Sequence, residues 1–128
     1  MRHSGLTDKI IGVFYEVYNE LGPGFLESVY ANAMILALRQ AGLTAEQERP
    51  VTVRFRGSVV GDFRADIVVE GVVLCELKAV SVLDSSAEAQ MLNYLRATGI
   101  EVGLLLNFGK EPKIKRFVFD HPRMRNPC

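Results

Sequence analysis

Two runs of alternating residues, 62–69 and 72–80, constrain this chain most, because only a short Glu70-Gly71 turn signal separates them. Residues two positions apart on a β-strand point to the same face of the sheet. In both runs one set of alternate positions is entirely apolar: Phe63, Ala65, Ile67, Val69, Val73, Cys75, Leu77 and Ala79. We therefore predict a β-hairpin whose two apolar sets face the same core.

The length of the hairpin loop determines which polar residues meet. A two-residue turn would pair Asp66 with Cys75 and split the polar set. A three-residue loop, with Gly71 in the left-handed conformation and a bulge after it, keeps each set together. The apolar pattern favours the three-residue loop, and in that register Asp66, Glu76 and Lys78 converge on one face.

Helical periodicity precedes this hairpin. The first predicted helix is capped by Thr7 and ends at the Gly22-Pro23-Gly24 turn. The second runs from about Leu26 to Gln40, and apolar residues cover most of its circumference, which indicates a well-buried helix.

A third predicted helix follows the hairpin, over residues 85–97. Its cap is Ser85 or Asp84, and Gly99 stops it. The residues that we expect to face the core are Ala89, Leu92 and Leu95.

Strand signals complete the pattern. Residues 51–55 alternate after Pro50, residues 102–108 are continuously apolar, and residues 114–119 suit a last, edge strand. The strand–helix–strand unit over residues 72–108 predicts a right-handed crossover and a parallel pair. Short turns make the earlier strands antiparallel. The expected fold class is α/β, a mixed β-sheet flanked by helices.

Length and composition indicate a single domain spanning residues 1–128. The chain has no apolar run long enough for a membrane span and no signal-peptide core near its start. We expect Cys75 and Cys128 to be free thiols, which favours a cytoplasmic location. His3 and His121, both near the termini, are too few to assemble a zinc site.

The charge distribution is uneven although the formal net charge is zero. Residues 110–128 carry a net charge of +4, which leaves −4 on the remainder. A basic end beside an acidic body could bring phosphates toward a cation site, whereas the alternative is a solvated C-terminal tail.

Two carboxylates on one sheet face suit a hard cation. Mg²⁺ binds oxygen ligands and keeps several waters, so Asp66 and Glu76, with the Leu77 carbonyl between Glu76 and Lys78, form a candidate site. Lys78 would lie beside a bound water and could orient or deprotonate it. The competing interpretation is a ladder of cross-strand charge pairs on a half-exposed sheet.

Four motifs in order make the pattern specific. Asp66 is followed by Glu76-Leu77-Lys78, and the helix before them carries Gly24-Phe25-Leu26-Glu27-Ser28-Val29-Tyr30, a GxxExxY signature. The helix after them carries Gln90 and Tyr94, a QxxxY pattern. Together they resemble the GxxExxY family of the PD-(D/E)xK nuclease superfamily over nearly the whole chain. Ala65 departs from the pattern by replacing the proline of the superfamily name.

The resemblance implies a restriction-endonuclease-like core and a Mg²⁺ or Mn²⁺ cofactor. It makes Asp66 and Glu76 metal ligands, with Glu27 completing the site directly or through water. It also makes Lys78 the catalytic lysine. Tyr30 is expected to pack in the core with its hydroxyl hydrogen-bonded to the site.

The resemblance further implies that Gln90 and Tyr94, which share a helix face, position the lysine or a phosphate. The implied activity is hydrolysis of phosphodiester bonds in nucleic acid, with DNA favoured over RNA. The alternative is a non-catalytic module of the same fold that binds or regulates with a partner protein. A neutral chain with no added DNA-binding module suggests that a partner protein or a second protomer, as a homodimer, supplies substrate recognition.

Overall fold

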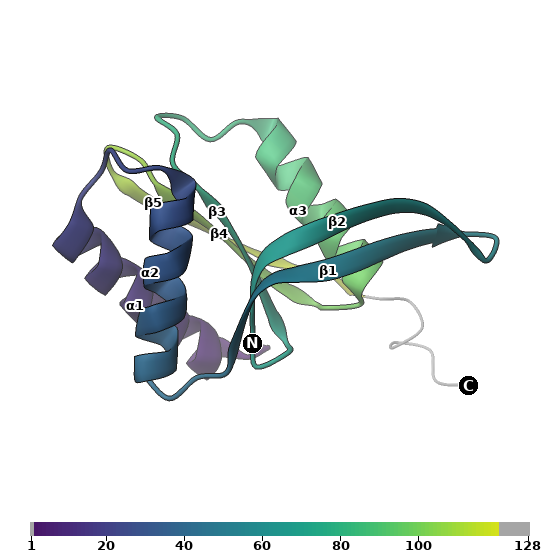
Figure 1. Cartoon of the computed structure of the whole chain (residues 1–128), viewed down its shortest axis with the longest axis horizontal. Helices are drawn as coiled ribbons and strands as arrows, with labels where there is room; N and C mark the ends of the chain where they lie inside the picture. Colours follow the sequence, from purple (N-terminus) through teal and green to yellow (C-terminus); the bar gives the residue numbers. More distant parts are fainter. Residues whose placement is uncertain (1, 121–128) are drawn as a thin grey trace.

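The computed structural model describes residues 2–120, which form a five-stranded sheet in the order β1-β2-β3-β4-β5. Helices α1 and α2 cover one face of the sheet and α3 covers the other (Figure 1). This arrangement confirms the predicted α/β class. The elements are α1 (Ser4–Leu21), α2 (Glu27–Gln40), β1 (Ala45–Phe55), β2 (Ser58–Val69), β3 (Val73–Lys78), α3 (Ser85–Thr98), β4 (Val102–Phe108) and β5 (Pro112–Val118).

The sheet is mixed, as predicted. Strands β3 and β4 are parallel, and each of the other neighbouring pairs is antiparallel. Every residue of β4 is buried, as expected for a continuously apolar strand with helices on both faces. Strand β5 lies at the edge, again as predicted.

The β2–β3 hairpin has the predicted three-residue loop. Val69 pairs with Val73, and the Val72 N–H donates to the Val69 carbonyl at 3.0 Å. Gly71 has a φ of 69°, so its left-handed conformation is confirmed, and Glu70 shares that conformation with a φ of 53°. This register directs Asp66 and Glu76 toward one another.

The predicted common face of the hairpin is wrong in one part. Ile67 packs with α1 and α2, as do Val73, Cys75 and Leu77 of β3, but Phe63 and Ala65 pack with α3. The β2–β3 ladder ends at Ile67, and beyond it β2 continues paired with β1 alone, as a ribbon that extends past the other strands (Figure 1). Glu48, which lies opposite Asp66 in this ribbon, has a φ of 53°. Two-stranded ribbons twist strongly, which accounts for the change of face.

Strand β1 is longer than predicted. It begins at Ala45 rather than Val51, so Pro50 lies inside it, opposite Arg64. An edge strand tolerates proline because one side of its backbone needs no ladder partner. The sequence signal was weak because residues 46–49, before Pro50, are all polar and show no alternation.

Helix α1 begins before the predicted cap. It starts at Ser4 after His3, and Thr7 is buried inside it with its hydroxyl donating to the Ser4 carbonyl at 3.1 Å. Thr7 as N-cap is therefore wrong. A threonine hydroxyl can satisfy itself on a preceding carbonyl within a helix, which removes the need for a helix end there.

Helix α2 is buried on one face only. Tyr30, Met34 and Leu38 are buried, but the Leu36 side chain is 60% exposed. The predicted burial on most sides is wrong because α2 lies on the sheet surface beside α1, with its outer face toward solvent (Figure 1).

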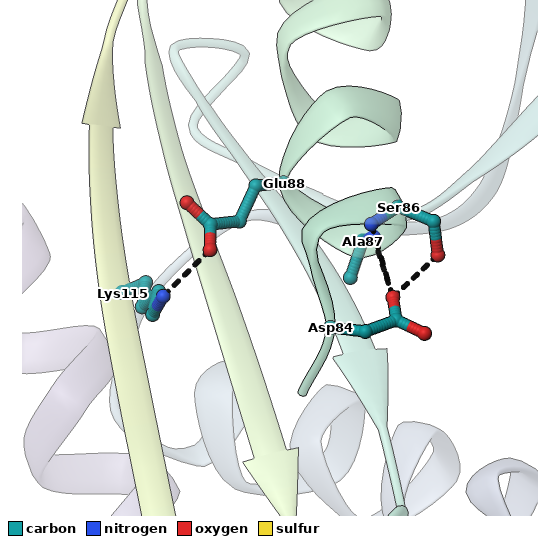
Figure 2. A network of polar contacts seen from close by, with 5 residues as sticks. All are labelled: Asp84, Ser86, Ala87, Glu88 and Lys115. Atoms are coloured by element: carbon teal, nitrogen blue, oxygen red, sulfur yellow. Dashed lines mark hydrogen bonds and ion pairs between the residues drawn. The ribbon is translucent and has the colours of Figure 1, made fainter. Parts of the chain in front are cut away.

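Helix α3 is held firmly at its start (Figure 2). The Asp84 carboxylate accepts hydrogen bonds from the N–H groups of Ser86 at 3.0 Å and Ala87 at 3.3 Å, which confirms Asp84 as the cap. One turn later Glu88 pairs with Lys115 of β5 at 2.7 Å. These contacts define the position of the helix that carries Gln90 and Tyr94.

The buried face of α3 differs from the predicted one. Met91 is buried beside Leu95, whereas Ala89 and Leu92 face outward. Gly103 of β4 makes room for Met91, since a Cβ at that position would lie 2.5 Å from the methionine sulfur. The helix ends at Gly99, in the left-handed conformation, as predicted.

No helix within residues 2–120 is long and apolar enough to cross a membrane. Cys75 is buried and forms no disulfide. His121, Cys128 and the last part of the predicted basic end lie outside the described residues.

Candidate functional site

Asp66 lies at the point where β2 and β3 separate. The last paired residues are Ile67 and Cys75, and the Asp66 side chain occupies the opening, where it accepts a hydrogen bond from the Leu77 N–H at 2.8 Å. In return, the Glu76 carboxyl accepts one from the Asp66 N–H at 3.3 Å. Each acid is therefore held by the backbone of the opposite strand, and the predicted convergence of Asp66 and Glu76 is present.

Glu76 is an ionisable group in an apolar position. Its side chain is buried, with 5% exposure. Burial first, and then the neighbouring Asp66 charge, raise the pKa of Glu76 to about 9, although the Lys78 charge opposes this rise. The pair therefore retains a proton at neutral pH when no cation is bound.

A cavity of about 220 Å³ opens beside Asp66. Its lining includes Asp66 and Leu77 from the hairpin, Glu27 from the first turn of α2, and Glu48 from β1. Glu27 is exposed at the helix N-terminus, where a negative charge is favourable. The structure thus brings Glu27 to the same hollow as Asp66, as its predicted role requires.

Lys78 lies on the α3 side of this hollow. It is half-buried and lines a second depression of about 150 Å³, together with Gln90. Buried Glu76 is two residues before Lys78 on β3. Glu27, Asp66 and Leu77 therefore line one depression and Lys78 and Gln90 line another, instead of a single open cleft.

Gln90 and Tyr94 form a hydrogen-bonded pair on α3. The Gln90 amide donates to the Tyr94 hydroxyl at 2.7 Å, and the Tyr94 ring stacks on Phe63 with centroids 4.1 Å apart. Burial, followed by the charges of Glu76 and Asp66, raises the pKa of Tyr94. The phenol is therefore close enough to respond to both carboxylates.

Comparison with known proteins places this geometry in a family. The family model described as the PD-(D/E)XK nuclease superfamily matches residues 4–117. This chain belongs to that superfamily. No curated protein matches it significantly.

The superfamily fold is also present in a solved structure. The crystal structure of SSO0001 superposes with a TM-score of 0.59 at 15% sequence identity. The match covers 77% of this chain and 52% of that chain, so this chain spans about half the length of SSO0001. At this identity the likeness shows the fold alone.

Nucleases of the PD-(D/E)XK superfamily typically use divalent metals, and the donor chemistry here fits such an ion. Asp66 and Glu76 supply carboxylate oxygens, and a bound cation would oppose the burial and the Asp66 charge that together raise the pKa of Glu76. Within residues 2–120, however, no group of three or more His, Cys, Asp or Glu side chains is arranged to hold a metal ion. Glu27 lines the Asp66 cavity, but it does not form a three-residue metal-binding group with Asp66 and Glu76.

Tyr30, the tyrosine of the GxxExxY motif, packs in the core and holds the turn before α2. The predicted core packing of Tyr30 is present, since its ring stacks on Phe108 with centroids 4.3 Å apart. Its hydroxyl donates to the Gly22 carbonyl at 2.6 Å and accepts from the Phe25 N–H at 3.2 Å. The hydroxyl therefore holds the turn that leads into Glu27. The prediction that this hydroxyl is hydrogen-bonded to the site is wrong.

Sequence reasoning missed Gln47 and Glu48, which line the Asp66 cavity. Gln47 donates to the Asn32 side chain of α2 at 2.8 Å, which links the cavity wall to that helix. Glu48 lies opposite Asp66 in the left-handed conformation, which is uncommon for a residue with a side chain. The only signal in the sequence was an acidic residue two positions before Pro50.

Proposed function

We propose that this chain is a metal-dependent nuclease that hydrolyses phosphodiester bonds of nucleic acid, with DNA favoured over RNA. The observation that carries the proposal is the meeting of Asp66 and Glu76 where β2 and β3 separate, in a chain of the PD-(D/E)XK nuclease superfamily. An anionic pair that retains a proton in the metal-free protein would exchange that proton for a cation.

The proposed ligands are Asp66, Glu76 and the Leu77 carbonyl, with Glu27 completing the site directly or through water. Mg²⁺ or Mn²⁺ bound there would lower the pKa of a water and stabilise charge on phosphate oxygens. The Leu77 N–H holds one Asp66 oxygen, which orients that carboxylate before any ion arrives. Backbone hydrogen bonds of this kind keep ligand geometry in place.

The proposed catalytic lysine is Lys78. Its position on β3, two residues after Glu76 and half-buried, allows it to orient an attacking water and to offset developing negative charge. The shared depression with Gln90 supports a positioning role for that amide. Tyr94, hydrogen-bonded to Gln90, would fix the amide orientation.

Within the superfamily, we propose the GxxExxY family and a single nuclease-like domain over residues 1–128. Gly24, Glu27 and Tyr30 match the signature, and the Tyr30 hydroxyl holds the turn that precedes Glu27. One sheet includes all five strands of residues 2–120, which supports a single domain. A homodimer through edge strand β5 is a further proposal, which sedimentation equilibrium would test.

A non-catalytic binding or regulatory module is the second candidate. The observation that favours it is the burial of Glu76, because a carboxyl that stays protonated at neutral pH is a weaker metal ligand. In that case the fold would act with a partner protein, and its acids would serve the structure.

Cleavage of labelled DNA and RNA, single- and double-stranded, tests the proposal. We expect cleavage in Mg²⁺ or Mn²⁺, none in EDTA, and none with Lys78→Ala. Lys9→Ala, an exposed lysine on α1, is the matched control and should cleave normally.

Calorimetry separates the two candidates. We expect Mn²⁺ binding that Asp66→Ala abolishes. Metal binding without cleavage would favour the regulatory module or a missing partner, and the absence of both would reject the nuclease.

A further inference from the structure

A groove separates the β1–β2 ribbon from α3. It has a volume of about 630 Å³ and is lined from the ribbon by Thr52, Arg54 and Phe63, and from the helix by Asn93, Tyr94 and Arg96. In Figure 1 the ribbon extends past the rest of the sheet with α3 alongside it. This volume is in the range of sites for small ligands, so the groove suits a short stretch of one strand better than a duplex.

The groove carries positive charge only. Arg54 and Arg96 come from opposite walls, and its lining, within the described residues, includes no carboxylate. The formal net charge of the chain is zero, so this local excess of arginine is not a general property of the surface. Guanidinium groups bind phosphate oxygens in bidentate geometry, which gives the groove the chemistry for a polyanion.

One wall of the groove is aromatic. Phe63 and Tyr94 are half-buried and stacked, with an interplanar angle of 14°. Aromatic side chains provide surfaces on which nucleic-acid bases stack irrespective of their sequence. Aromatic and arginine side chains together are typical of sites for single-stranded nucleic acid.

The groove adjoins the candidate site through Tyr94. Tyr94 lines the groove, and its hydroxyl accepts from Gln90, which lines the depression beside Lys78. A strand lying in the groove would therefore lie next to the depression that holds Gln90 and Lys78.

We propose that this groove binds a single-stranded segment of nucleic acid next to the scissile phosphate. Arg54 and Arg96 contact the phosphates, and the Phe63–Tyr94 pair contacts the bases. The inference rests on the proposed nuclease function for its biological meaning, but the binding itself needs no metal. The groove would be a substrate-binding element that the zero net charge of the chain does not indicate. Its size favours single strands over duplexes.

Fluorescence anisotropy with labelled mixed-sequence oligonucleotides tests the proposal. The full chain is titrated onto one single strand and onto the matched duplex in EDTA, which prevents metal-dependent cleavage. We expect tighter binding of the single strand. Arg54→Ala and Arg96→Ala should each weaken it about three- to tenfold and reduce the salt slope by about 0.7 per lost phosphate contact.

Lys9→Ala removes one positive charge on the opposite side of the sheet and should leave binding unchanged. Equal losses in Lys9→Ala and Arg54→Ala would overturn the proposal, as would tighter duplex binding or no binding. Arg54 and Arg96 are exposed, so their variants should keep the wild-type circular dichroism.

The cleavage assay keeps this inference separate from the proposed function. Metal-dependent cleavage with no effect of Arg54→Ala on binding would overturn the groove and leave the nuclease intact. Arginine-dependent binding without any cleavage would support the groove and count against the nuclease function.

Discussion

Replacement of Glu76 by glutamine isolates the electrostatics of the two acids. Glutamine has the shape of the protonated acid, so its carbonyl can still accept from the Asp66 N–H and its amide can donate to the Asp66 carboxylate. Glu76 is nearly inaccessible to solvent, with 5% exposure, so water cannot replace lost interactions. The variant therefore changes the ability to ionise and leaves packing almost unaltered.

The magnitude follows from the raised pKa. Burial and Asp66 move the pKa of Glu76 from 4.5 to about 9, so the folded chain binds this proton more tightly than the unfolded chain. The stabilisation is complete below about pH 4.5 and is lost as the pH rises toward 9. At about pH 7.5 the loss is about 4 kcal/mol, which is a large share of the ~5–15 kcal/mol that stabilises a typical domain.

Urea unfolding in EDTA, followed by circular dichroism, measures this difference. We expect Glu76→Gln to exceed wild type by up to about 4 kcal/mol at about pH 7.5, and by no more than about 1 kcal/mol at about pH 5. Glu16→Gln, an exposed acid on α1, is the control and should follow wild type at both pH values. Parallel pH profiles for wild type and Glu76→Gln would refute the argument that burial holds this proton.

Three further predictions test the site and its frame. Millimolar Mg²⁺ should raise the melting temperature of wild type more than that of Glu76→Ala, because the ion relieves carboxylate repulsion; equal shifts would count against the site. Gly109→Ala should lower the free energy of unfolding in urea by about 1–3 kcal/mol, since its Cβ would lie 2.3 Å from the Val80 carbonyl oxygen. Gly12→Ala, on an open helix face, should instead raise the free energy of unfolding by about 0.5–1 kcal/mol. Tyr30→Phe should cost about 1–3 kcal/mol by losing both hydrogen bonds to the turn before α2, and an unchanged midpoint would contradict that anchoring role.

Local patterns predicted much of the fold. The continuous apolar run of β4 indicated a strand covered on both faces, and Gly71 and Gly99 marked a turn and a helix end that need the left-handed conformation. These signals work because burial and backbone geometry act within a few residues. Predictions failed where a neighbour elsewhere in the chain decided the outcome, as when Gly103 made room for Met91 and so set the buried face of α3.

For the candidate site too, local patterns predicted some features correctly and others wrongly. Alternation across the hairpin was sufficient to predict that Asp66 and Glu76 meet, because the strand period and loop length determine register. The same alternation assigned Phe63 and Ala65 to the wrong face, because the twist of the free ribbon has no signature in a two-residue pattern.

Only the tertiary structure decided what surrounds the two acids. The sequence alone determined the order of elements, the hairpin register and the residue types of the motifs, since each depends on local propensity and periodicity. It could not determine that the chain buries Glu76, brings Glu48 of β1 to the Asp66 cavity, or forms an arginine-lined groove between the ribbon and α3. Those features depend on the packing of segments distant in sequence, and packing sets the local dielectric, the pKa of Glu76 and the shape of the surface.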